Sequence, residues 1–373
     1  MPSRRQFITH AATGTAALVA GSALMGLFSR AHAQNAAPIM PQSTQTSGGK
    51  WRPPYRFGQG GAPLGGGSML EVSDAEVLEI LDNAWDAGMR YYDTSPWYGL
   101  GLSERRFGYS LHRQPRDSYI LSTKIGRILT PADAPPETQW ANPDSFNYTY
   151  DYSASATRRS IEDSLQRLGI PSIDVVFVHD LTPENLKGEY EQHMQEAIKG
   201  AMPELTKMRE EGIIKAWGMG VNSLPPILRA NEAADPDLHL AACQYTLMDH
   251  TESLQKLFPD CDKRGISIVV GSPLNNGFLC GRDRYNYSGT IPDGFKEKRA
   301  RMQQIAKAHD TDLRTAALQF CAAPSTVSSV IPGARKAHQP AENVKSMSVR
   351  IPADFWAELK AEKLIDEAAP TPA

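Results

Sequence analysis

Residues 91–99 read YYDTSPWYG and place an acid, Asp93, at the end of a short apolar run, with Tyr98 five residues later. Two further apolar, strand-like runs follow; the first ends on Lys124 and the second ends on His179. In a parallel α/β protein the C-terminal ends of the strands meet on one rim, where active sites lie. The sequence therefore predicts that these four titratable side chains meet there, in a pattern typical of proton-coupled chemistry.

Strand-like and helix-like segments alternate from residue 57 onward. The first clear helix begins at the capping box Ser73–Glu76 and ends near Gly88. With a first strand near residues 60–62, the alternation gives eight strand–helix units, and no segment between them has the character of a domain linker. This pattern predicts one (β/α)8 barrel (a TIM barrel) rather than an open sheet over residues 55–373, with additional helices at its C-terminal end.

Several segments need separate interpretation. Residues 34–54, rich in Gln, Ser, Pro and Gly, are typical of a flexible leader, and residues 56–59 are expected to form one strand of a plug ahead of the barrel.

Residues 127–153 form a long insertion rich in Pro and Tyr. Loops of this length on a catalytic rim are usually functional, and a surface elaboration is the alternative. Continuous helices are expected over residues 190–211 and 253–264.

Residues 1–33 resemble an export signal of the twin-arginine type. Arg4 and Arg5 precede a weakly apolar run over residues 11–28, and Ala31–Ala33 offers small residues for cleavage. A membrane helix is the alternative, but the run is short and interrupted by glycines, so no stable membrane insertion is expected. The pattern predicts that the twin-arginine translocation machinery delivers the folded protein to the periplasm.

Composition narrows the possible partners. The chain has 373 residues, 41% of them hydrophobic and 22% charged, which is enough to form a large core. A net charge of -3 and the absence of long Lys/Arg runs argue against nucleic acid as a partner. The four cysteines form no C-x-x-C pair and have no histidine at metal-ligand spacing. We therefore expect no metal site, and we interpret the cysteines as small buried residues.

The four strand-end residues suit reversible hydride transfer to a carbonyl. Tyr98 can protonate the developing alkoxide, although its ordinary pKa near 10 is too high for the reverse role. Lys124 beside it would lower that pKa, and Asp93 would keep the lysine charged. A neutral His179 would donate a hydrogen bond to the carbonyl oxygen. Each residue alone has a structural explanation, but their joint pattern favours a catalytic site.

With these residues in place, the chain resembles the aldo-keto reductases. The resemblance runs from Tyr55 to the C-terminal helices and includes residues 220–223, 271–274 and 332–343. Within the family, the narrower likeness is to the group of L-fucose and D-threo-aldose 1-dehydrogenases and pyridoxal 4-dehydrogenase. The resemblance implies a barrel that holds NAD or NADP across its rim and acts on an aldose or aldehyde. A Rossmann fold is rejected, because residues 218–223 lack the last glycine of G-x-G-x-x-G.

The resemblance also implies which residues contact the cofactor. Asn222 and Gln244 match positions that hydrogen-bond the carboxamide of the nicotinamide. Ser272 and Leu274 match contacts to the pyrophosphate, and Glu342 and Asn343 match contacts to the adenine. The implied contacts are Asn222, Ser223, Gln244, Gly271, Ser272, Leu274, Arg335, Gln339, Glu342 and Asn343.

Two departures from the family pattern concern the cofactor. Gly271 stands where many members stack a tyrosine on the nicotinamide, so another residue must cover that face. Gly333 and Gln339 stand where NADP-specific members carry a lysine and an arginine for the 2′-phosphate. Their neutrality favours NAD over NADP, although Arg335 and Lys336 lie close enough in sequence to compensate.

The sequence leaves three functions open. The leading one is an NAD(P)-dependent oxidoreductase that oxidises an aldose at its anomeric carbon or reduces an aldehyde. A second keeps NAD(P) permanently bound and shuttles hydride between two substrates, which suits a compartment without free cofactor. The third is a non-catalytic sugar-binding barrel, and the intact set of four strand-end residues argues against it.

Overall fold

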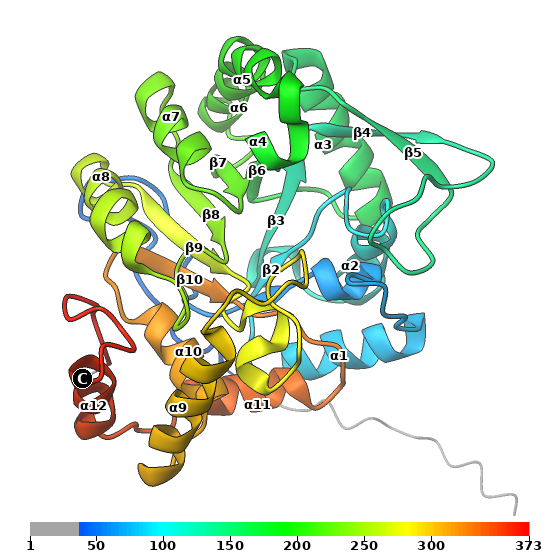
Figure 1. Cartoon of the computed structure of the whole chain (residues 1–373). Helices are drawn as coiled ribbons and strands as arrows, with labels where there is room; N and C mark the ends of the chain where they lie inside the picture. Colours follow the sequence, from blue (N-terminus) through cyan, green and yellow to red (C-terminus); the bar gives the residue numbers. More distant parts are fainter. Residues whose placement is uncertain (1–36, 373) are drawn as a thin grey trace, which may run out of the picture. The chain divides into compact units, whose positions relative to one another are not determined.

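Parallel strands and surrounding helices alternate through residues 37–372, the part of the chain that the computed structural model describes (Figure 1). Their order in the sheet follows the chain, and every neighbouring pair is parallel. The predicted (β/α)8 barrel is confirmed; the predicted export signal lies outside the described residues. The barrel strands are β1 (Gln59–Gly60), β2 (Tyr91–Asp93), β3 (Ile120–Ile125), β6 (Val175–His179), β7 (Ala216–Val221), β8 (Leu238–Ala242), β9 (Ser267–Gly271) and β10 (Val327–Ile331).

Helices form the outer layer (Figure 1). Their apolar faces pack on the outward-facing strand residues in one continuous core. The α-helices are α1 (Asp74–Asp86), α2 (Leu102–Leu111), α3 (Ala154–Leu168), α4 (Pro183–Leu186), α5 (Tyr190–Lys199), α6 (Ala201–Glu210), α7 (Pro225–Ala233), α8 (Phe258–Arg264), α9 (Phe295–Ala308), α10 (Leu313–Ala322), α11 (Gln339–Ser346) and α12 (Ala353–Ala361). Short 3-10 turns are η1 (Ala62–Gly65), η2 (Arg116–Ser118), η3 (Lys187–Glu189) and η5 (Asn275–Cys280), and η4 (Ser253–Leu257) is a π-helical turn.

The barrel closes between its last and first strands. Phe57 pairs with Val330, and Gly60 pairs with Gly333, both in the parallel sense. The prediction of an N-terminal plug is therefore wrong only in its position: residues 56–59 belong to the barrel, and the antiparallel bridges lie before them. This backbone enters the barrel itself, because the last strand offers it a free hydrogen-bonding edge.

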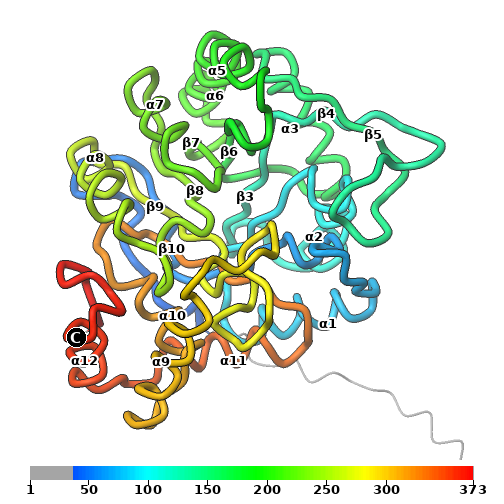
Figure 2. Tube along the Cα trace, viewed as in Figure 1, coloured from blue at the N-terminus to red at the C-terminus, as the bar shows by residue number. Residues whose placement is uncertain are grey.

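A hairpin of residues 41–55 covers the N-terminal end of the barrel. Two antiparallel bridges lie within it, and Trp51 and Tyr55 pack against the inward-facing side chains of the strands. The side-chain amide of Gln42 donates to a carbonyl of β10 at 2.7 Å, and the trace runs beside β9 and β10 (Figure 2). The predicted flexible leader is thus wrong for residues 37–54: aromatic burial and hydrogen bonds fix this segment, despite its polar composition.

Two helices predicted to be continuous are interrupted. Residues 190–211 divide at Gly200 into α5 and α6, since Pro203 lacks the N–H that would continue the helical ladder. Residues 253–264 begin as the π-helical turn η4 before α8, and Pro259 lies at this junction. In both places proline overrides an otherwise helical pattern.

The insertion after β3 is a β-hairpin. Its strands are β4 (Arg127–Pro131) and β5 (Phe146–Tyr150), which pair in the antiparallel sense and extend away from the barrel (Figure 1). The base of the hairpin and the loop at its tip line the cavity on the C-terminal rim. The insertion therefore belongs to the wall of the site.

Candidate active site

A cavity of about 610 Å³ opens at the C-terminal ends of the strands. It extends from the β4–β5 hairpin to the loop before α11. All four predicted catalytic residues line it, as do aromatic rings and a few charged side chains. Its size and mixed walls are typical of a site for small molecules.

Asp93 and Lys124 form a buried ion pair at the base of the cavity. The register of β2 and β3 sets Asp93 beside Ser122, whose hydroxyl donates to Oδ1 at 2.7 Å. Lys124 Nζ donates to Oδ1 at 2.9 Å, to Oδ2 at 2.7 Å and to the carbonyl of Thr94 at 2.7 Å. Burial raises the pKa of Asp93 and lowers the pKa of Lys124, and their mutual attraction opposes both shifts. The three donors of the ammonium are therefore all engaged.

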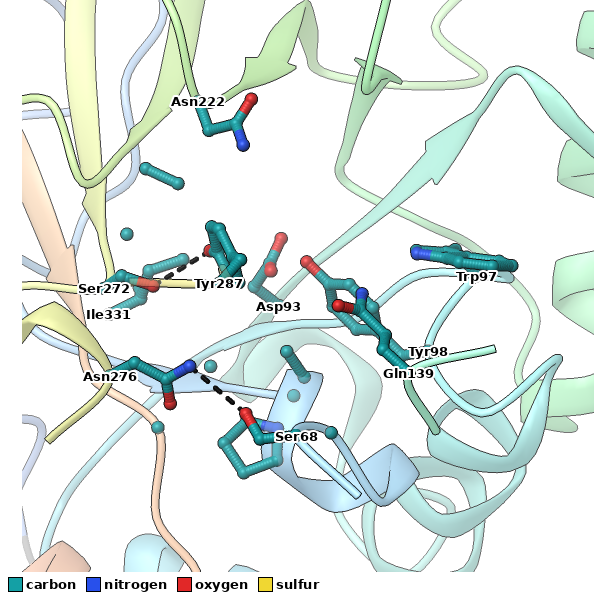
Figure 3. Close-up of a pocket in the computed structure, with 18 of the residues that line it drawn as sticks. Ser68, Asp93, Trp97, Tyr98, Gln139, Asn222, Ser272, Asn276, Tyr287 and Ile331 are labelled. Carbon is teal, nitrogen blue, oxygen red and sulfur yellow. Dashed lines mark hydrogen bonds between the residues drawn. The ribbon is translucent and has the colours of Figure 1, made fainter. Parts of the chain in front are cut away.

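Tyr98 lies beside Asp93 (Figure 3), and the Lys124 ammonium is 4.7 Å from the centre of its ring. Burial, and then the charge of Asp93, raise the pKa of Tyr98 well above 10. The prediction that Lys124 lowers this pKa is wrong in this structure, because its ammonium is bonded to Asp93 and lies against the ring face. The phenol is therefore protonated at neutral pH and serves as a proton donor.

His179 is a neutral imidazole beside Tyr98. Its Nδ1 lies 3.0 Å from Ser95 Oγ, which accepts the N–H of Trp97 at 3.1 Å and so has its own hydrogen free for Nδ1. On this basis we assign the imidazole hydrogen to Nε2. Burial, and then the charges of Lys124 and Arg127, hold the pKa of His179 well below 6.5. Nε2 can thus donate a hydrogen bond to a substrate oxygen at neutral pH.

The remainder of the cavity fits a dinucleotide. Asn222 Oδ1 is buried without a hydrogen-bond partner among the described residues, as an acceptor reserved for a ligand would be. Arg335 is half-buried, and burial with the neighbouring charges of Arg282 and Arg284 lowers its pKa to about 10. Such a concentration of guanidinium groups suits an anion such as pyrophosphate.

Seven of the ten predicted cofactor residues line this cavity: Asn222, Gly271, Ser272, Leu274, Arg335, Gln339 and Asn343. The other three are held by neighbours. Gln244 donates to the carbonyl of Asn222 at 2.7 Å, Ser223 lies 3.4 Å from Glu184, and Glu342 is paired with Arg314. Gln244 therefore positions the backbone of Asn222 in this structure.

The two neutral positions noted for the 2′-phosphate supply no cation here. A side chain at Gly333 would place its Cβ 2.5 Å from Pro63, which excludes a larger residue. Gln339 Oε1 accepts the backbone N–H groups of Arg335 at 2.7 Å and Lys336 at 3.2 Å. The side chain of Gln339 thus stabilises the loop that carries Arg335 and Lys336.

Tyr287 contacts Ser272, the residue that follows Gly271. It comes from the loop after η5, and its hydroxyl is 2.9 Å from Ser272 Oγ. Figure 3 places its ring between Ser272 and Asp93, and the residue is 40% exposed. An aromatic ring from a different segment therefore lies next to the residue that follows Gly271.

Sequence reasoning missed the residues that hold or flank the catalytic four. Ser95 and Ser122 are separated from them by only one or two positions in sequence, but nothing in the pattern singles them out. Asp180 follows His179 directly, and Arg127 opens the insertion; both positions carried a usable signal. Both side chains line the cavity.

Three further observations apply to residues 37–372. No group of three or more His, Cys, Asp or Glu side chains within this range is arranged to hold a metal ion. None of its helices combines the length and the apolar character needed to cross a membrane. All four cysteines are free, and Cys280 is exposed rather than buried as expected.

Comparisons with known proteins agree with this geometry. The family model described as "Aldo/keto reductase family" matches residues 56–363. A D-threo-aldose 1-dehydrogenase from Pseudomonas sp. is 36% identical over 323 residues, covering 84% of this chain and 94% of that protein. A pyridoxal 4-dehydrogenase from Microbacterium luteolum is 35% identical over 325 residues, covering 83% and 94%. A solved aldo-keto reductase from Bacillus halodurans, in its holo form, superposes with a TM-score of 0.67 at 22% identity, covering 88% of this chain and 98% of that one.

Proposed function

Since the chain belongs to the aldo/keto reductase family, we propose that its reaction is the oxidation of an aldose at the anomeric carbon. The general activity is that of an NAD(P)-dependent oxidoreductase, which transfers hydride between nicotinamide and an aldose or aldehyde. The observation that carries this proposal is the arrangement of Tyr98 and neutral His179 beside the buried Asp93–Lys124 pair. The 36% identity to a D-threo-aldose 1-dehydrogenase supports the choice of an aldose.

The chain's own residues move the proton and orient the substrate. When bound, the nicotinamide supplies or accepts the hydride. His179 Nε2 donates to the reacting oxygen and fixes its position, and Tyr98 exchanges a proton with the same oxygen. Asp93 and Lys124 hold a fixed charge pair beside the tyrosine. Because Tyr98 is protonated at neutral pH, we expect oxidation to accelerate as the pH rises, and reduction to be favoured near neutrality.

NAD is the proposed cofactor. Asn222, with its unpartnered amide oxygen, would bind the carboxamide, and Arg335 would bind the pyrophosphate. Gly333 and Gln339 supply no cation for a 2′-phosphate, which supports NAD over NADP.

We also propose export to the periplasm by the twin-arginine machinery, a proposal that rests on Arg4 and Arg5 in the sequence. Replacing both with lysine is expected to retain the precursor in the cytoplasm. Unchanged periplasmic protein after fractionation would reject the proposal. Export as a folded protein would carry in any cofactor already bound.

The function is tested with the purified mature protein, NAD⁺ and a panel of aldoses, by following NADH formation, with Tyr98→Phe as the inactive control. Cofactor content after purification separates the alternatives. Stoichiometric bound NAD(P) with hydride exchange between two substrates would indicate a shuttle. Sugar binding with no turnover would indicate a non-catalytic barrel, and turnover of aldehydes alone would reject the aldose.

A further inference from the structure

A second charged pair lies in the cavity beside the catalytic residues. Arg127 begins β4, Asp180 directly follows His179, and Arg127 Nη1 is 3.0 Å from Asp180 Oδ2. The side chains are 4% and 19% exposed, so the pair is largely removed from bulk water but open to the cavity. The proton transfer described above uses neither residue.

The guanidinium of Arg127 is held in a cage of aromatic rings. Its Cζ lies 4.4 Å from the ring centre of Trp97, 4.8 Å from that of Tyr150 and 5.8 Å from that of Tyr148. Nη2 donates to the Tyr150 hydroxyl at 2.9 Å. Nε and Nη1 make no hydrogen bond within the described residues, although Nη1 is close to Asp180. Since Nη1 is ion-paired with Asp180 and Nη2 donates to Tyr150, Nε is the donor without a partner, and a buried donor of this kind can take a further acceptor.

Asp180 has a backbone conformation that is uncommon for a side-chain-bearing residue. Its φ is +49°, in the left-handed region, and its N–H donates to the carbonyl of Gly220 at 3.0 Å. Its Oδ1 lies 3.5 Å from His179 Nε2, the atom that donates a hydrogen bond to the reacting oxygen of the substrate. The carboxylate of Asp180 therefore lies next to the imidazole that binds the reacting oxygen of the substrate.

We propose that Arg127 and Asp180 together recognise two neighbouring hydroxyl groups of the substrate, next to its reacting carbon. A hydroxyl both donates and accepts, so one can accept from Arg127 while the next donates to Asp180. A carboxylate or phosphate at this point would be repelled by Asp180, and an alkyl chain would offer neither residue a hydrogen bond. The ring of Trp97 offers an apolar surface for the C–H groups between them. The proposal rests on the proposed function and specifies its substrate class as a polyhydroxylated aldehyde.

The test compares two aldehydes of equal chain length, glyceraldehyde and propanal, which differ only by two hydroxyl groups. The wild type is expected to prefer glyceraldehyde in kcat/KM. Asp180→Asn is expected to lower the ratio of the two kcat/KM values by about tenfold or more. Arg127→Lys, which keeps the charge but loses the planar fork, should shift the ratio in the same direction. Asp144→Asn is the matched control, since its partner Arg105 is 2.9 Å away and neither residue lines the cavity; it should leave the ratio unchanged.

Binding of xylitol, a polyol that cannot react as an aldehyde, gives a second measurement by calorimetry. If the wild type oxidises no aldose and reduces neither aldehyde, the proposed function fails, and xylitol binding that weakens in Asp180→Asn still supports hydroxyl recognition. Equal losses for both aldehydes in Asp180→Asn would overturn the proposal, because the residue would then act only by positioning His179. A wild type that prefers propanal, or that does not bind xylitol, would also overturn it.

Discussion

Replacing Lys124 with methionine is expected to destabilise the protein by about 4 kcal/mol at pH 7, and the cause is the carboxylate that remains. In the wild type, Nζ donates to both oxygens of Asp93, and the two side chains are only 1% and 3% exposed. Methionine retains most of the apolar volume of lysine, so little packing is lost. Asp93 keeps the hydrogen bond from Ser122 but loses its counter-ion.

The magnitude follows from the protonation of Asp93. A buried carboxylate without a counter-ion takes up a proton rather than remain charged. Its ordinary pKa is 3.8, so at pH 7 the proton uptake costs about 4 kcal/mol, or about 1.4 kcal/mol per pH unit. In the variant the folded-state pKa of Asp93 lies above its unfolded value, so the folded state binds more protons. The deficit is therefore present at pH 7 and disappears as the pH falls toward 4.

Urea unfolding, followed by circular dichroism between about pH 5 and pH 8, measures this deficit directly. The double variant Asp93→Asn/Lys124→Met is the control, because no ionisable group remains at the pair and its folded state takes up no proton there. A deficit in Lys124→Met below about 1 kcal/mol at pH 7 would refute the reasoning. So would a deficit that does not shrink toward pH 5.

Three further outcomes are expected. Tyr98→Phe should lower kcat by about a hundredfold or more while NAD⁺ affinity, measured by calorimetry, stays unchanged; a loss below about tenfold would argue against proton transfer by this hydroxyl. Arg335→Ala should weaken NAD⁺ binding by about tenfold, and tighter wild-type binding of NADP that collapses in this variant would reverse the cofactor assignment. Burial lowers the pKa of His239 to about 3 and that of His250 to about 4, so the unfolded state binds more protons below pH 6.5. The free energy of unfolding should therefore fall with pH below about 6.5, by up to about 1.4 kcal/mol per histidine per unit, and a flat profile between about pH 4.5 and 6.5 would contradict this.

The sequence alone determined the barrel and the positions of its catalytic residues. Strand-length apolar runs alternating with capped amphipathic helices depend on local propensity and burial, which are readable from a short window. Asp93, Lys124 and His179 stand at the ends of such runs, and all parallel strands end on one rim. Their convergence therefore followed from the pattern before any contact was known.

The tertiary structure decided the contacts that join distant segments. Gln42 reaches β10 across 286 positions, and this bond helps fix a segment whose composition is typical of a leader. Arg127 meets Asp180 from a different strand end, and Tyr287 contacts Ser272 from the loop after η5. Such pairings depend on how the chain closes on itself, which no local pattern encodes.

For Tyr98, too, the sequence determined one property and the tertiary structure another. Its identity and its place after Asp93 marked it as a proton carrier, and the nearby Lys124 suggested a lowered pKa. The direction of the shift depended on where the lysine ammonium makes its bonds: to Asp93 and the Thr94 carbonyl, with the phenol ring lying against it. Sequence determines which charges lie on one rim; only the folded geometry determines which atoms they face, because electrostatic effects depend on distances of a few ångströms and on burial.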